Sequence, residues 1–105
     1  MKVYMDDARK TPEGFVRTYT AEETKILLLT RQVQFLSLDN DLGSLDPATE
    51  GYNVVNFIEE LVYFDPTFPV PEMVVHSSNA SRALSMRQAI KRLDVVRQQQ
   101  NNNEL

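Results

Sequence analysis

Four short apolar segments, separated by helical or polar stretches, constrain the fold of this 105-residue chain most strongly. They span residues 2–5, 15–19, 33–38 and 73–76. Each segment has the length and the residue types that are typical of a β-strand. Because helical segments alternate with these strands, we expect right-handed crossovers and a mostly parallel sheet that is covered on both faces. The sequence therefore predicts an α/β domain.

Three segments of the chain are predicted to form helices. Thr20 is expected to cap the first, because Glu23 stands three residues later and completes a capping box. The second has apolar residues at i, i+3, i+4 and i+7 between Val54 and Leu61, which is the pattern of a helix with one buried stripe. The third follows the last strand and runs into a polar stretch rich in glutamine and asparagine.

The length of the chain suits one domain, which we expect over residues 1–97, with a flexible polar tail over residues 98–105. The absence of cysteine excludes disulfides, thiolate zinc sites and cysteine nucleophiles, and it favours a reducing compartment such as the cytoplasm. We expect no signal peptide and no membrane span. The formal net charge of −4 argues against binding to double-stranded DNA.

Polar clusters follow three of the predicted strands at the point where each strand ends. The clusters are Asp6–Asp7, Asp39–Asp41 and His76–Asn79. Ligands of open parallel sheets bind beyond the carboxyl ends of the strands, so we expect the three clusters to meet at one edge. Carboxylate oxygens are the ligands that Mg²⁺ prefers. The alternative for both acidic clusters is a turn in which aspartate side chains bond to the loop backbone.

His76 is the only histidine, and imidazole exchanges protons readily near neutral pH, which makes this residue a candidate general acid or base. It could equally be a half-buried histidine that bonds to the backbone. Ser77 and Asn79 could offer hydroxyl and amide groups to a phosphate at a helix N-terminus, although helix capping also explains them. Arg9 could clamp a phosphate or neutralise a nearby aspartate.

In combination, these motifs resemble the family of cyclic-phosphate-processing receiver-like domains. The resemblance is carried by the segments Asp6–Pro12, Ser37–Gly43, Glu50–Asn53 and His76–Asn79. It implies a modified response-regulator receiver fold, which is a three-layer sandwich with a mostly parallel four-stranded sheet and about three helices. It also implies a role in handling cyclic phosphates, such as RNA 2′,3′-cyclic ends or related nucleotides.

The clusters and the resemblance together lead us to expect a metal-dependent phosphoesterase that acts on a cyclic phosphate of RNA or of a nucleotide. In this hypothesis, Mg²⁺ or Mn²⁺ is held by Asp6, Asp7 and Asp39. His76 acts as acid or base, and Asp41 orients a ligand or a water molecule. The phosphate is contacted by Arg9, Ser77 and Asn79.

Two other functions stay open at this point. A non-catalytic protein that sequesters a nucleotide would use the same pocket, and Asn40 favours this reading because the family often has histidine there. A degenerate receiver would instead signal through phosphorylation of Asp39. The sequence argues against the receiver, because we find no fifth strand with the lysine that receivers use beside the acceptor aspartate.

Overall fold

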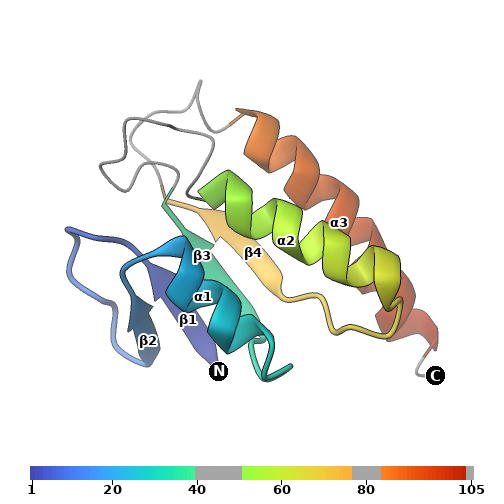
Figure 1. The fold of residues 1–105 in the computed structure, drawn as a ribbon, viewed down its shortest axis with the longest axis horizontal. Coiled ribbons are helices and arrows are strands. Elements are labelled where there is room, and N and C mark those ends of the chain that lie inside the picture. The colour runs from blue at the N-terminus through green and yellow to red at the C-terminus, as the bar shows by residue number, and fades with distance from the viewer. Residues whose placement is uncertain (40–50, 77–83, 104–105) are drawn as a thin grey trace.

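A computed structural model describes residues 1–39, 51–76 and 84–103, and Figure 1 shows how their helices and strands are arranged. These ranges contain four strands and three helices. In chain order they are β1 (Lys2–Met5), β2 (Phe15–Thr18), α1 (Ala21–Leu28), β3 (Phe35–Leu38), α2 (Gly51–Phe64), β4 (Glu72–Val75) and α3 (Leu84–Asn103). Each strand lies where the sequence predicted it, within two residues at either end.

The strands form one parallel sheet in the order β2-β1-β3-β4. The chain crosses the sheet in the same direction from β2 through α1 to β3 and from β3 through α2 to β4. Right-handed crossovers therefore place α1 and α2 on the same face, and in Figure 1 both helices lie in front of the strands. The predicted receiver-like α/β fold, with its four-stranded parallel sheet and three helices, is confirmed.

The two faces of the sheet are covered differently. Val3, Leu36 and Met73 lie in register, point toward the helices and are buried in the hydrophobic core. The residues that alternate with them point to the other face, called here the second face. No helix of the described ranges packs on the second face, so the described elements form two layers where the resemblance implied three. The reason is that the connection between β1 and β2, residues 6–14, contains no helix.

Helix α1 begins as its sequence predicted. The Thr20 hydroxyl accepts a hydrogen bond from the Glu23 backbone N–H at 3.1 Å, which satisfies one of the free donors of the first turn. The Glu23 carboxylate reaches back to the backbone N–H of Tyr19 at 3.3 Å, one residue before the position that the capping box predicted. The helix thus starts with both parts of the cap in place.

Helix α3 continues to Asn103, through most of the segment that was predicted to be a flexible tail. The prediction is wrong for residues 98–103, because the amide side chain of Gln100 bonds to three backbone groups of the α2–β4 connection. Gln100 accepts from Val70 N–H at 3.2 Å and donates to the carbonyls of Phe68 at 2.7 Å and Pro66 at 3.1 Å. Within the described ranges, no helix has the length and hydropathy needed to cross a membrane.

Candidate functional site

Three of the predicted site residues come together at the carboxyl ends of β1, β3 and β4. Each directly follows its strand, and its backbone N–H donates to the neighbouring strand. The three bonds run from Asp6 to Thr18 at 3.1 Å, from Asp39 to Met5 at 3.1 Å and from His76 to Leu38 at 2.9 Å. They extend the sheet by one residue, so the backbone of the sheet itself fixes where these three side chains start.

Strand alternation places all three of these side chains on the second face. Asp6 follows Tyr4, and Asp39 follows Ser37, two residues later on the same face of the strand. One ligand atom from each of Asp6, Asp39 and His76 lies within 4.8 Å of the others. Asp6 and Asp39 are 1% and 7% exposed, which is unusual for carboxylates. The two buried carboxylates are donors that can hold a divalent cation, and the imidazole stands beside them.

The Asp6 carboxylate is held by four groups. Its Oδ1 accepts hydrogen bonds from the backbone N–H groups of Ala8 at 2.8 Å and Arg9 at 3.0 Å. Its Oδ2 lies 2.9 Å from His76 Nε2 and 3.5 Å from Arg9 Nη1. Burial raises the pKa of Asp6, but the hydrogen bonds from Arg9, Ala8 and His76 outweigh burial, and the pKa lies below its ordinary value. Asp6 is therefore ionised near neutral pH.

The His76 ring is held on both of its nitrogens and on one face. Nε2 faces Asp6 at 2.9 Å, and Nδ1 lies 2.6 Å from the hydroxyl of Ser37. The ring stacks on Tyr4, with a centroid distance of 4.3 Å and an angle of 6° between the planes. Because an ionised Asp6 only accepts hydrogen bonds, Nε2 carries a proton, and in the neutral ring Nδ1 accepts from Ser37. The three residues form a hydrogen-bonded chain from Ser37 through His76 to Asp6.

Two arginines tie the loop after β1 to the site. Arg9 Nη1 donates to the carbonyl of His76 at 2.5 Å, while about half of the side chain stays exposed. Arg17 Nε donates to the carbonyl of Asp6 at 2.6 Å, and its Nη1 donates to Thr11 at 2.9 Å and to the carbonyl of Arg9. Arg17 therefore holds the backbone on which both Asp6 and Arg9 stand.

Gly51, the first residue of α2, lets this helix approach the site closely. A Cβ atom at Gly51 would lie 2.6 Å from the carbonyl oxygen of Asp39 and 2.8 Å from the sulfur of Met86. Both distances are shorter than a methyl group tolerates, so any other side chain would push α2 or the Asp39 backbone away. The start of α2 thus sets the position of Asp39 from the helical side.

The other predicted site residues fall into two groups. Asp7 is exposed and does not belong to the cluster of possible ligands among the described residues, because it follows Asp6 directly and cannot share its direction. The remaining three lie outside the described residues, so their roles stay predictions: Asp41, Ser77 and Asn79. Arg9 lies beside Asp6, which fits the ion-pair alternative and also leaves donors for an anion.

Sequence reasoning missed several residues that build the site. Ser37 could have been noticed in the sequence, since it is the lone hydroxyl within an apolar strand. Tyr4 was harder to notice, because an aromatic ring on a predicted strand usually packs in the core. Nothing in the sequence indicated Arg17, since its bonds to backbone carbonyls depend on the folded path of a loop.

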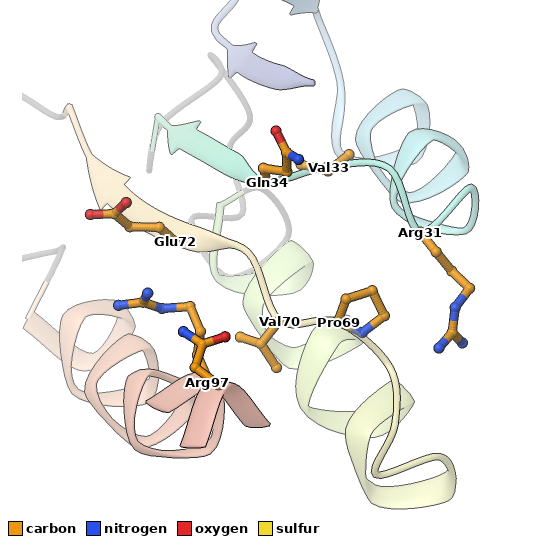
Figure 2. Close-up of a pocket in the computed structure, with 8 residues that line it drawn as sticks. Arg31, Val33, Gln34, Pro69, Val70, Glu72 and Arg97 are labelled. Carbon is orange, nitrogen blue, oxygen red and sulfur yellow. The ribbon is translucent and has the colours of Figure 1, made fainter. Parts of the chain in front are cut away.

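A separate hollow lies at the opposite end of the sheet, where β3 and β4 begin (Figure 2). It has a volume of about 360 Å³ and is flanked by Arg31 and Arg97. Arg31 already bonds to Asp65 at 3.1 Å and to the Thr67 carbonyl at 3.0 Å. Arg97 Nε lies 3.7 Å from a carboxylate oxygen of its own helix, which is an ion-pair distance, and neither atom has a hydrogen-bond partner in the part of the chain that the structure describes. Each cation of this hollow thus lies beside a carboxylate, and the described cluster of possible ligands lies elsewhere, so the candidate site remains the cluster around Asp6.

A parallel sheet whose described helices lie on one face, and which has buried aspartates and a histidine at its carboxyl end, defines a receiver-like α/β domain. The family of cyclic-phosphate processing receiver domains matches residues 1–92, and the chain belongs to this family. No curated protein and no solved structure matches the chain. The family ties the protein to the processing of cyclic phosphates.

Proposed function

We propose that the protein is a metal-dependent phosphoesterase that acts on a cyclic phosphate of RNA or of a nucleotide. The observation that carries the proposal is the cluster of Asp6, Asp39 and His76, whose ligand atoms lie within 4.8 Å of one another in a domain of this family. The cluster stands beyond the carboxyl ends of parallel strands, which is where open α/β sheets bind ligands.

Mg²⁺ or Mn²⁺ fits the donors of this cluster. Asp6 and Asp39 are buried carboxylates within a few ångströms of each other, and like charges at such a distance repel unless a cation or a proton lies between them. Asp6 is already oriented, because two backbone N–H groups hold its Oδ1. When bound, such a cation polarises a phosphoryl oxygen and lowers the pKa of a coordinated water molecule.

The residues of the chain supply the other parts of the proposed reaction. Arg9 is about half exposed beside Asp6, and its Nε and Nη2 have no hydrogen-bond partner among the described residues, which suits an anionic phosphate. His76 is the proposed acid or base, and Ser37 and Asp6 orient its ring. The proposed roles of Asp41 in orienting a ligand, and of Ser77 and Asn79 in contacting phosphate, rest on the sequence.

The metal part of the proposal is tested by thermal unfolding with and without millimolar Mg²⁺ or Mn²⁺. Binding to the folded state alone raises the melting temperature, and we expect Asp39→Asn to abolish the rise. Glu60→Gln, which removes an exposed carboxylate of α2, is the matched control and should keep the rise. An equal rise in wild type and Asp39→Asn would remove Asp39 from the site.

The catalytic part is tested by the turnover of a 2′,3′-cyclic nucleotide. We expect His76→Ala to reduce turnover by about 100-fold or more, as for the loss of a general acid or base, with affinity changed by only a few-fold. Normal turnover by His76→Ala would make the histidine structural.

One observation favours the second candidate, a protein that binds the nucleotide without turning it over. Both ring nitrogens of His76 are engaged, by Asp6 and by Ser37, so proton donation to a substrate requires one of these bonds to open. Wild-type protein that binds the cyclic nucleotide and never opens it would establish sequestration and overturn the phosphoesterase proposal.

A further inference from the structure

The second face of the sheet carries aromatic side chains from three adjacent strands. Phe15 lies between Tyr4 and Phe35, with ring centroids 6.1 Å from Tyr4 and 5.9 Å from Phe35, edge to face in both pairs. None of the three belongs to the hydrophobic core under the helices. Phe15 and Phe35 stay half-buried, and Val74 on the same face is 42% exposed. An aromatic surface therefore remains on the side that the described helices leave uncovered.

This aromatic surface lies on the same face of the sheet as the candidate site. Along β3, Phe35, Ser37 and Asp39 share the second face, and four residues of strand span about 13 Å. Tyr4 connects the two ends, because its ring packs on Phe15 on one side and stacks on His76 on the other. Tyr4 and Ser37 are only 7% and 6% exposed, so a ligand held at Asp39 and His76 would reach Phe35 by passing over these two buried residues.

Cations accompany the rings on this face. Lys2 Nζ lies 5.7 Å from the centre of the Phe15 ring, and Lys2 itself is exposed. Arg17 projects from the same face of β2, but its Nε and Nη1 already donate to backbone carbonyls and to a threonine of the loop that holds Asp6, which leaves Lys2 as the exposed cation beside the rings. Among the strand residues that point to this face, Glu72 of β4 is acidic. Rings interleaved with cations are what single-stranded nucleic acid requires, since bases stack on the rings and phosphates contact the cations.

We infer that the second face binds the unpaired nucleotides that precede a 3′-terminal cyclic phosphate, with Phe15 and Phe35 as stacking partners. The inference rests on the proposed function, because it takes the phosphate to lie at Asp6, Asp39 and His76. It makes the substrate a single-stranded RNA end, and a mononucleotide would reach only the end of the face near Tyr4. A helix from another protein fits less well, because its packing would bury charged side chains on this face.

The inference is tested with a 5′-fluorescent hexanucleotide RNA that ends in a 2′,3′-cyclic phosphate, measured by anisotropy in the presence of Mg²⁺. The variant is Phe35→Leu, which removes the ring and keeps an apolar side chain. We expect it to bind the hexanucleotide about 5-fold or more weakly, the range of one lost base stack. Its affinity for 2′,3′-cyclic AMP should stay within about 2-fold of wild type. Tyr63→Leu, which removes an 81% exposed ring at the end of α2, is the control and should match wild type.

Three outcomes overturn the inference. In one, Phe35→Leu binds the hexanucleotide as tightly as wild type does. In another, the hexanucleotide and the mononucleotide lose affinity equally, which makes Phe35 a structural support of the site. In the third, Phe35→Leu turns a dimer of the wild type into a monomer, which makes the face a contact between two copies. Selective loss of hexanucleotide binding supports the inference even where no turnover occurs, so its failure and that of the phosphoesterase proposal are distinguishable.

Discussion

Replacing Ser37 with alanine is expected to destabilise the fold and to release the ring of His76. Ser37 lies in the middle of β3 and is only 6% exposed, and its hydroxyl lies 2.6 Å from His76 Nδ1. Alanine fits the same space and the same strand, so the change removes one hydroxyl and little else. His76 Nδ1 would then face an apolar methyl group in a site with little access to water.

The expected loss in the free energy of unfolding follows from the burial of the hydrogen bond between Ser37 and His76. An intramolecular hydrogen bond contributes about 1 kcal/mol, and a buried polar atom left without a partner adds its desolvation penalty, for a total of about 1–3 kcal/mol. In a domain of this size, that loss lowers the melting temperature by about 5–15 °C. The measurement is urea unfolding in the presence of EDTA, so that no bound cation contributes to stability. Ser37→Thr keeps the hydroxyl on a residue that strands accept well, and it should recover most of the loss.

A double-mutant cycle assigns this loss to the proposed bond. In a His76→Ala background, Ser37→Ala should cost at least 1 kcal/mol less than it does in wild type, roughly the coupling expected of two residues in one hydrogen-bonded chain. Imidazole ¹⁵N NMR adds a direct readout, because the neutral ring should carry its proton on Nε2, opposite Asp6. An equal cost of Ser37→Ala in both backgrounds, or a neutral ring protonated on Nδ1, would contradict the hydrogen-bonded chain from Ser37 through His76 to Asp6.

Three further predictions concern other contacts. Gly51→Ala should cost about 1–3 kcal/mol in urea unfolding and weaken Mg²⁺ binding in titration, because its Cβ would lie 2.6 Å from the Asp39 carbonyl; unchanged values would contradict the close approach. The hydrogen bond from Thr67 lowers the pKa of Asp65, so the ionised Asp65 adds stability at pH values above its ordinary pKa, and this stability is lost as the pH falls through the lowered pKa. The melting temperatures of Asp65→Asn and wild type should therefore differ at pH 7 and converge in acid. Gln100→Ala should destabilise the domain by roughly 1–2 kcal/mol, whereas a disordered tail would show no change.

Periodicity made most of the fold predictable. The stripe from Val54 to Leu61 predicted α2 because a helix repeats every 3.6 residues, and Val54 and Ile58 are indeed completely buried. The end of α3 was missed for the opposite reason. A run of glutamine and asparagine has no apolar period, and only the folded chain brings Gln100 to the backbone of the α2–β4 connection.

The meeting of the polar clusters was predictable as well, because parallel strands bring their carboxyl ends to one edge. The face of the sheet to which these side chains point was not predicted, although it follows from the alternation of side chains along a strand. Asp6, Asp39 and His76 follow strands whose alternate residues face away from the core. We expected helices on both faces of the sheet, and a second helical layer would have covered the face on which the site lies.

The hydrogen bonds that continue the sheet past its strands fix the backbone of the three residues that form the candidate site. The N–H groups of Asp6, Asp39 and His76 each donate to an adjacent strand, so no side-chain substitution removes these bonds. Arg17 also donates to the carbonyl of Asp6, and Gly51 lies against the carbonyl of Asp39. On such a frame, the proposed cation would bind with little loss of conformational entropy. Cation binding should therefore appear as added stability, with the backbone of the three strands unchanged.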